Sequence, residues 1–536
     1  MSEAAGADAP GAVDEGGPGA APGGGAGGYL THKQVMIVLP GLLLTMTLAM
    51  LDQLVVGTAL PRIVGDLGGV SHLSWVVTAY ILASTVTTPF YGKLGDMYGR
   101  KKLFIFAIVL FLIGSALSGL SSSMAQLIMF RALQGLGAGG LMVGAMSTLG
   151  EIVPPRERGK YMSYFMAVMM LATVGGPLLG GWITTSFSWR WIFYINLPIG
   201  GAALVYMWAT LKLPTRRVEH RIDYLGGVLL GVIATAIILV ATWGGTEYRW
   251  LSTPVLGLIA LAVVAFVAFL AVERRAAEPM LPLHVFKIRN FSLAMSMAFF
   301  VGLGLFGAMT FLPLYQQTVQ GASPTVSGVL LTPMMIGSAG MSILAGTLVS
   351  KTGRYKLFPI VGGVVMTVAM FLLTRLSVDT TRWQTSIDFV ILGVGMGCLM
   401  QMVSLIAQNS VELKDIGVAT SARMFFQQMG GSLGVAAFGA VFASRLNSVM
   451  ASAGSAGSKF HVTGTFDPAQ VSSLPHAVQQ IVFRAVTHGE QAVFIAVLPA
   501  SVVVFLLALF IKQVPLRGRM PSEKATPAPE AEALIG

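Results

Sequence analysis

Long apolar segments recur along nearly the whole chain, and they restrict its fold more than any other feature of the sequence. Each can cross about 30 Å of hydrocarbon as a helix, and helices are required because backbone polar groups find no water inside a bilayer. We therefore predict an all-α integral membrane protein with fourteen transmembrane helices. The predicted spans are residues 35–57, 73–92, 102–120, 124–147, 161–184, 190–211, 224–243, 253–272, 291–315, 326–350, 357–376, 386–408, 419–444 and 491–512.

The distribution of basic residues predicts how the chain is oriented. The connections after the even-numbered spans hold most of the 34 Lys and Arg. Because positive residues are retained on the cytoplasmic side, we expect both termini there, which requires an even number of spans. The same placement explains the net charge of +11, so we predict no nucleic-acid partner. The basic residues predicted on the outer side are Arg62, Arg190, Arg249, Arg375, Arg382, Arg445, Lys459 and Arg484.

Neither end of the chain has the composition of a folded domain. Residues 1–30 are rich in Gly, Ala and Pro, and residues 513–536 are polar and Pro-rich, so we predict two disordered cytoplasmic tails. The first residues also lack the apolar stretch of a secretory signal. The single cysteine, Cys398, excludes an intrachain disulfide and a cysteine-based zinc site, and we predict no metal site and no cofactor.

An internal repeat divides the chain into two halves. GKLGDMYGRKK at 92–102 recurs as GTLVSKTGRYK at 346–356, and GLGAGGLM at 135–142 recurs as GVGMGCLM at 393–400. Chance similarity between Gly-rich helices is the alternative, but two echoes at matching places favour duplication, which is common in transporters. We predict a six-helix bundle at 31–212, a two-helix insertion at 213–289, and a second six-helix bundle at 290–512 with an extracellular loop at 445–490.

These segments resemble the major facilitator superfamily, and specifically its fourteen-helix drug:proton antiporter branch. GKLGDMYGRKK is similar to the signature loop of the superfamily, and LDQLVVGTALP at 51–61 is similar to the first-helix signature of this branch. RALQGLGAGG at 131–140 and GGPLLGG at 175–181 resemble its fourth-helix and fifth-helix motifs. The resemblance covers about residues 35–512. It implies a major facilitator fold, in which two bundles give alternating access to a central cavity.

Asp52 is the most informative single residue, because it is an acid within the first predicted span. A charge there is costly unless it is paired, hydrated or protonated. Arg131 is the expected partner, since the two residues lie about 8 Å and about 10 Å from the outer ends of their helices. An antiporter needs an acid that exchanges a proton for substrate, and the resemblance implies a proton-transfer role for Arg131. The alternatives are an acid in contact with interfacial water and an arginine that binds helix carbonyls.

The loop after the second span is expected to act in conformational change. It contains Gly92, Asp96, Gly99, Arg100 and Lys101. Glycine permits tight turns, and Asp96 can pair with Arg100 or cap a neighbouring helix, where a negative charge is favourable. The resemblance implies a latch that holds one conformation during alternating access. The alternative is a positive cluster that only sets the orientation.

The fifth span carries a second motif with a structural consequence. Gly176 and Gly180 form a small-xxx-small face that lets helices approach closely, and Pro177 bends the helix. The resemblance implies that these residues and Gly181 seal the interface of the two halves against proton leakage. Simple helix packing is the alternative.

Polar residues in or near the spans are candidates for a substrate cavity. They are Gln53, Tyr80, Gln134, Tyr315 and Gln316. The 30 Met and 29 Phe suit an apolar cavity that adapts to varied shapes. No acid is found near the middle of a span in the second half, so hydrophobic neutral or monovalent substrates are favoured over multiply charged cations.

We predict a secondary transporter, not an enzyme, that exports amphipathic compounds in exchange for protons, acts as a monomer in a bacterial inner membrane and confers drug resistance. ATP is not the expected driver, because no G-x-x-x-x-G-K-[ST] loop occurs in the sequence. The first alternative is a dedicated exporter of one natural product, metabolite or lipid that gives self-resistance. The second is a membrane sensor or scaffold, which needs a folded soluble domain that neither tail provides.

Overall fold

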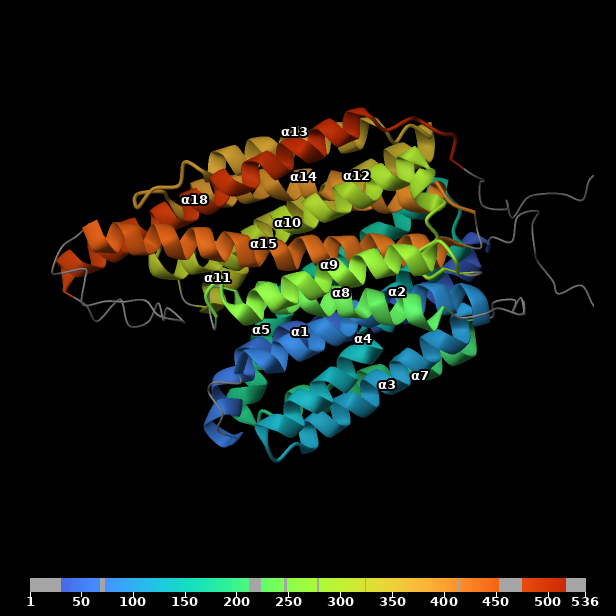
Figure 1. Ribbon diagram of the computed structural model, residues 1–536, viewed down its shortest axis with the longest axis horizontal. Helices are drawn as coiled ribbons and strands as arrows, with labels where there is room; N and C mark the ends of the chain where they lie inside the picture. The colour runs from blue at the N-terminus through green and yellow to red at the C-terminus, as the bar shows by residue number, and fades with distance from the viewer. Residues whose placement is uncertain are drawn as a thin grey trace, which may run out of the picture.

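The computed structural model describes residues 30–67, 73–211, 223–244, 248–276, 279–322, 324–412, 415–452 and 475–516. Within these ranges the chain forms long helices that run roughly along one direction (Figure 1). Almost all of the two predicted tails lies outside the described residues.

The first half of the described chain pairs its helices closely. α2 and α3 both pack on α4, while α5 packs on α1. The sixth predicted span is divided between a single helical turn and a longer helix. The helices are α1 (His32–Leu67), α2 (Leu73–Tyr98), α3 (Arg100–Leu120), α4 (Met124–Ile152), α5 (Pro155–Ser186), α6 (Trp191–Tyr194) and α7 (Asn196–Thr210).

The second half repeats this arrangement after an inserted pair of helices. The insertion is α8 (Tyr224–Trp243) and α9 (Thr253–Glu273), followed by the short helix η2 (Val285–Lys287). α12 and α13 both pack on α14, as α2 and α3 pack on α4. The helices of this half are α10 (Arg289–Thr318), α11 (Pro324–Leu330), α12 (Thr332–Thr352), α13 (Leu357–Leu373), α14 (Arg382–Asn409), α15 (Ile416–Ser452) and α18 (His476–Leu509).

Each predicted span falls on a helix or on a pair of consecutive helices. Among the described residues, ten helical segments are long and apolar enough to cross a membrane, and Arg289–Leu305 and Leu357–Leu373 are shorter apolar helices. The all-helical fold is therefore confirmed, whereas the count of fourteen spans stays a prediction. The two remaining helices, α2 and α5, pack across the interface of the halves: α2 on α15 and α5 on α12. α8 covers the first of these contacts, since it touches both α2 and α15.

The glycine echo of the repeat has a structural cause. A side chain at Gly139 of α4 would overlap the carbonyl oxygen of Ser84 in α2, and one at Gly397 of α14 would overlap the carbonyl oxygen of Ser338 in α12. Equivalent glycines thus allow equivalent helix pairs to approach at backbone distance. This correspondence supports duplication over chance similarity.

Replacing Gly397 with alanine is therefore expected to destabilise the fold. The added methyl group has to displace the backbone of α12, and overpacking of this kind costs about 1–3 kcal/mol. Gly340→Ala is the matched control, because no atom lies within 4 Å of a methyl group at that position of α12. The melting temperature of the purified protein in detergent should fall for Gly397→Ala and not for Gly340→Ala. Equal melting temperatures would contradict the packing argument.

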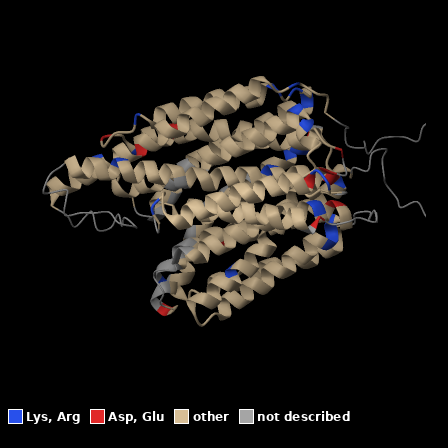
Figure 2. Ribbon diagram, viewed as in Figure 1, with Lys and Arg blue, Asp and Glu red and all other residues tan. Residues whose placement is uncertain are grey.

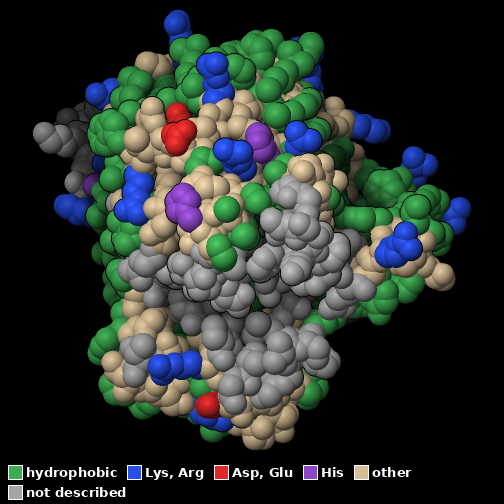
Figure 3. Space-filling model, turned by 90° about the vertical axis from the view of Figure 1, so that its left-hand side faces the viewer, with side chains coloured by type: hydrophobic (Ala, Val, Ile, Leu, Met, Phe, Trp, Pro, Cys, Tyr) green, Lys and Arg blue, Asp and Glu red, His purple; other side chains and the backbone are tan. Residues whose placement is uncertain are grey.

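The surface is apolar on its flanks and basic at one end. Figure 2 shows Lys and Arg gathered at the right-hand end, where α2 ends and α3 begins; we call this the basic end. Large apolar side chains are exposed along the helices, for example Trp208 at 68% and Val264 at 66%. Figure 3 looks onto the opposite end and shows hydrophobic side chains around its flanks. Such an apolar belt suits lipid contact.

Both ends of the loop predicted at 445–490 are helical, which corrects its sequence-based boundaries. α15 continues to Ser452 and α18 begins at His476, so only residues 453–474 lie between them, outside the described residues. Both helix ends extend beyond the neighbouring helices on the left of Figure 1, so their residues need not be apolar. Their polar residues therefore have the composition of a loop.

Candidate functional site

Asp52 and Arg131 form a buried ion pair in the first half. Asp52 comes from α1 and Arg131 from α4, and each is 1% exposed. Nη1 of Arg131 donates to Oδ2 of Asp52 at 2.7 Å. The pairing predicted from their matching depths is confirmed, and an acid facing interfacial water is excluded by its burial. Whether the pair couples protons stays a prediction.

Two amides complete the coordination of the Asp52 carboxylate. Nε2 of Gln134 and Nδ2 of Asn196 each donate to Oδ1 at 2.8 Å. Asn196 opens α7, and its Nδ2 also lies 3.0 Å from Oγ of Ser115 in α3. Three helices thus meet at one carboxylate, which accepts three hydrogen bonds. A buried charge is tolerated when it is paired and hydrogen-bonded in this way.

The guanidinium of Arg131 is enclosed on its other sides. It lies 4.1 Å above the ring centroid of Tyr80 in α2 and 5.8 Å from that of Phe193 in α6. Nη1 also donates to Oε1 of Gln134 at 2.8 Å. Cation–π contacts stabilise a desolvated guanidinium. Neutralising the carboxylate with a proton would leave Arg131 without a charged partner among the described residues, so the network responds chemically to one proton.

The predicted cavity residues do not gather at one place. Tyr80 and Gln134 are fully buried members of the ion-pair network, while Gln53 beside it is exposed. Tyr315 and Gln316 lie in α10 of the second half, where the Tyr315 hydroxyl donates to the carbonyl oxygen of Ser377 at 2.6 Å. The sequence grouped these residues by polarity, but the fold gives them different roles.

The predicted latch loop joins the two halves at the basic end. Oδ1 of Asp96 accepts a hydrogen bond from Arg100 at 2.6 Å, and its two oxygens accept from the backbone N–H groups of Gly417 at 3.1 Å and Val418 at 2.9 Å. Asp96 therefore caps the N-terminus of α15 in the other half, where a negative charge is favourable. Arg100 also pairs with Glu151 of α4 at 2.8 Å. We call these five residues the latch.

The glycines of the loop have distinct functions. Gly99 has φ 91 between the end of α2 and the start of α3, a conformation that glycine adopts readily. Gly92 abuts α15: a side chain there would overlap Ser421 and the carbonyl oxygen of Gly417. Lys101 lies outside the latch, because its Nζ donates to the carbonyl oxygen of Trp208 at 2.7 Å.

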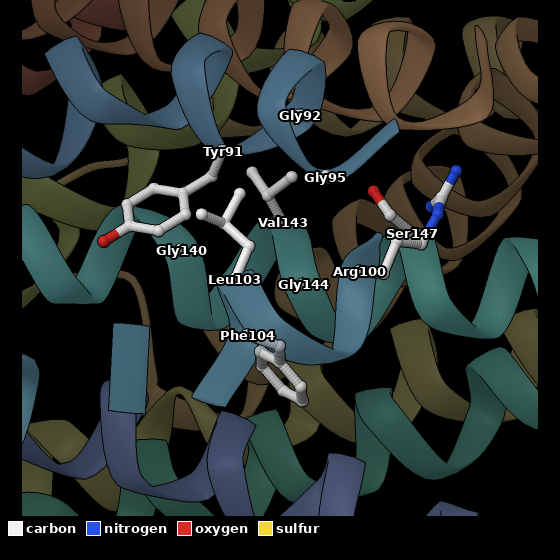
Figure 4. Close-up of a pocket in the computed structure, with 10 residues that line it drawn as sticks. All are labelled: Tyr91, Gly92, Gly95, Arg100, Leu103, Phe104, Gly140, Val143, Gly144 and Ser147. Atoms are coloured by element: carbon white, nitrogen blue, oxygen red, sulfur yellow. The ribbon is translucent and has the colours of Figure 1, made fainter. Parts of the chain in front are cut away.

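A small cavity lies behind the latch, between α2, α3 and α4. Figure 4 labels its lining residues, with Arg100 and Ser147 at one side and Tyr91 at the other. Its volume is about 10 Å³, far below the roughly 300–1,000 Å³ of typical ligand pockets. We therefore assign it to packing of the latch rather than to substrate.

A second contact between the halves lies at the start of α5. Nη1 of Arg158 donates to Oε1 of Gln408 in α14 at 3.0 Å, while its other nitrogens donate to the carbonyl oxygens of Val153 and Gly150 at the end of α4. The backbone of Gly159 is so close to Gly346 of α12 that neither could carry a side chain without displacement. Since Gly346 is the repeat equivalent of Gly92, both copies of the motif place a glycine at the interface.

The fifth-helix motif lies against its own half. A side chain at Gly176 would press on Leu54 of α1, and the hydroxyl of Thr184 donates to the carbonyl oxygen of Gly180 at 2.7 Å. No atom lies within 4 Å of a methyl group placed at Gly181. Close packing at Gly176 is confirmed, but its partner is α1 rather than the second half. The side chain of Pro177 is outside the described part of the structure.

Sequence reasoning missed several residues of these contacts. They are Ser115, Glu151, Arg158, Asn196 and Gln408. Asn196 carried a usable signal, because it is an amide within the apolar segment WIFYINLPIG. Arg158 lies in a basic connection between two predicted spans, and nothing in the sequence indicates its burial at 3% exposure.

Comparison with known proteins gives consistent relatives. The Major Facilitator Superfamily matches residues 42–435. An uncharacterized MFS-type transporter of Mycobacterium tuberculosis (strain H37Rv) is 40% identical over 508 residues, covering 95% of this chain and 72% of that protein. The multidrug transporter protein MdtP of Bacillus subtilis (strain 168) is 39% identical over 414 residues, covering 77% of this chain and 76% of that protein.

A fungal relative and a solved structure extend the comparison. A protein of Aspergillus aculeatus described as an acurin A biosynthesis cluster MFS-type transporter is 36% identical over 408 residues, covering 75% of this chain and 74% of that protein. The structure of the proton:xylose symporter XylE aligns with a TM-score of 0.57 at 14% identity, covering 90% of this chain and 95% of that chain. At this identity the structure supports a shared fold alone.

Proposed function

Because the chain belongs to the major facilitator superfamily and is a membrane transporter, we propose that it exports amphipathic organic compounds in exchange for protons. The name of the related multidrug transporter supports export of varied compounds. The buried Asp52–Arg131 pair is the observation that carries the proton coupling. It places an acid with a bound counter-ion within a span, where ionisable residues mark proton and substrate pathways.

The coupling step follows from the three hydrogen bonds to Asp52. A proton taken up by the carboxylate cancels its attraction for Arg131 and removes one acceptor position from the network. The helices that contribute to it, α1, α4 and α7, then lose a shared constraint. Release of the proton on the other side restores the pair. The transporter thus has two charge states with different helix packing, as proton-driven alternating access requires.

The latch supplies the conformational part of the cycle. Asp96 holds the N-terminus of α15, and Arg158 holds the end of α14, so the two halves are closed at the basic end. We assign this end to the cytoplasm on the basis of its Lys and Arg, in a bacterial inner membrane with both termini inside. Substrate entry from the cytoplasm then requires these contacts to separate. A monomer suffices, because both halves lie in one chain.

The test is transport by everted membrane vesicles across a panel of lipophilic neutral and monovalent compounds. An inwardly acidic pH gradient should drive uptake of several compounds into vesicles that contain the protein, and nigericin should abolish it by collapsing the gradient. Vesicles without the protein provide the baseline. Uptake that continues unchanged after collapse of the gradient would refute proton coupling.

A dedicated natural-product exporter is the second candidate, because one relative is named for a biosynthesis cluster. The same vesicles separate the two candidates. A multidrug exporter transports several chemically unrelated compounds, and these compete with one another. A dedicated exporter transports one compound, and the rest of the panel neither moves nor competes.

A further inference from the structure

Arg423 of α15 is a buried arginine with only a neutral hydrogen-bond partner among the described residues. It is 7% exposed, and its Nη1 donates to Oε1 of Gln427 at 2.6 Å. Its Nε has no hydrogen-bond partner, and no hydrogen bond from Nη2 is found in the described part of the chain. Arg100 and Arg131, by contrast, each form an ion pair with a carboxylate. Arg423 therefore differs from the arginines of the latch and of the ion-pair network.

The position of Arg423 is close to the interface of the halves. Seven residues separate it from the start of α15, so it lies about 10 Å from the basic end of that helix. Ser421 abuts Gly92 of the first half, and Met424 packs into the core of the first half. One turn nearer the basic end, Thr420 accepts a hydrogen bond from an α14 amide at 3.0 Å. Arg423 thus stands just beyond the latch, on a helix that contacts both halves.

An uncompensated guanidinium at this place is energetically unfavourable. Burial removes its hydration, and a neutral amide returns only part of that loss. Nε and Nη2 form one edge of the planar guanidinium, and this edge matches the two oxygens of a carboxylate. Gln427 accepts from Arg423 through its amide oxygen, which leaves its two amide N–H groups available to donate to an anion.

We propose that Arg423 and Gln427 bind the carboxylate of an anionic amphipathic substrate at the interface of the two halves. This proposal rests on the proposed export function and narrows its substrate class. It narrows the sequence-based expectation of hydrophobic neutral or monovalent compounds to monovalent anions, because that expectation considered acids but not an unpaired arginine.

A methionine-lined space of about 10 Å³ lies farther from the basic end, also between the two halves. It lies between α5 of the first half and α12 and α14 of the second, and its lining includes Met169, Met334, Met335, Met396 and Met400. Gln408 of α14 and Thr420 of α15 lie at one depth, because they are hydrogen-bonded. From that level, Met400 lies about 12 Å farther from the basic end along α14, and Arg423 lies about 5 Å farther along α15. Methionine side chains adapt to varied apolar shapes. With a volume of about 10 Å³ in this closed state, the space can admit the apolar part of an amphiphile only after the methionines move apart.

The test compares three ligands that differ only in the head group. A dansyl-labelled alkyl carboxylate, its primary amide and its amine are titrated into the purified full-length protein in nanodiscs of zwitterionic lipid, and binding is followed by fluorescence. The wild type should bind the carboxylate at least about tenfold more tightly than the amide, since a charged hydrogen bond contributes about 1.5–3 kcal/mol. Equal affinities for carboxylate and amide would overturn the proposal without any variant.

Substitutions then assign the preference to one side chain. Arg423→Gln should weaken carboxylate binding at least about tenfold and leave amide binding within about twofold, while Arg423→Lys should retain part of the preference. Arg445→Gln is the matched control, because Arg445 lies exposed on the same helix. An unchanged carboxylate preference in Arg423→Gln would overturn the assignment. Complete displacement of the carboxylate ligand by anionic phospholipid added to the nanodisc would also overturn the proposal, since the site would then hold lipid.

Failure of this proposal is distinguishable from failure of the export function. Proteoliposomes with an imposed pH gradient report transport of the amide and the amine independently of the carboxylate. Gradient-driven transport of these two compounds, with no carboxylate preference in binding, refutes the anion site alone. A carboxylate preference lost in Arg423→Gln, with no gradient-driven transport of any compound, supports the anion site and refutes proton coupling.

Discussion

Replacement of Asp52 with asparagine is expected to reduce gradient-driven efflux to the level of vesicles that lack the protein. Asparagine keeps the shape of the side chain but cannot take up and release a proton. It also leaves Arg131 buried without a counter-ion, which costs about 3–5 kcal/mol. The measurement is uptake of lipophilic compounds by everted vesicles in a pH gradient, with the amount of inserted protein determined in the same membranes.

The double variant Asp52→Asn, Arg131→Gln separates coupling from stability. Removing both charges together avoids the unpaired arginine, and replacement of a complete buried ion pair is often close to neutral for stability. Its melting temperature in detergent should therefore exceed that of Asp52→Asn, while efflux stays abolished. Normal gradient-driven efflux by either variant would remove this pair from the mechanism.

Replacement of Gly92 with alanine is expected to open the basic end and to slow transport strongly. The methyl group overlaps Ser421 and the carbonyl oxygen of Gly417, so α15 has to move away from α2 and its N-terminus leaves Asp96. Gly95→Ala is the matched control three residues along the same helix. A methyl group there comes no closer than 3.7 Å to any neighbouring atom, so transport should be retained.

Cysteine labelling reports the opening directly. The only native cysteine, Cys398, is buried and can be replaced with serine, and a cysteine is then introduced at Ser404, which is buried in α14. A membrane-impermeant maleimide applied from the basic end should label this cysteine faster in Gly92→Ala than in Gly95→Ala. Equal labelling rates in the two variants would show that the contact at Gly92 does not control closure.

The helices were largely predictable because the bilayer imposes a simple pattern on the sequence. A segment facing lipid must be apolar over about twenty residues, and this requirement is local. The pattern failed at residues 445–490, where α15 and α18 continue beyond the apolar region and polarity no longer distinguishes helix from loop. It also does not reveal that α2 and α5 face the opposite half, because apolarity does not identify packing partners.

For the Asp52–Arg131 site, the sequence predicted only the depth of each residue along its helix. Position along a helix follows from counting residues, so the sequence could place Asp52 and Arg131 at one level. The rotation of each helix about its axis is fixed by packing between elements far apart in the chain. Asn196 reaches Asp52 across 144 positions, and Asp96 reaches Val418 across 322. The unpaired edge of Arg423 could not be predicted from the sequence, because it depends on where the fold places every carboxylate of the chain.

The length of the last two helices has a practical consequence for imaging. α15 has 37 residues and α18 has 34, which correspond to about 55 Å and about 51 Å, whereas a bilayer with its headgroups is about 40–45 Å thick. The far ends of this pair, which extend beyond the neighbouring helices on the left of Figure 1, are therefore expected to project past the headgroups. For a 56.4 kDa chain, such a projection would provide an off-axis landmark for particle alignment and a structured epitope for an antibody fragment.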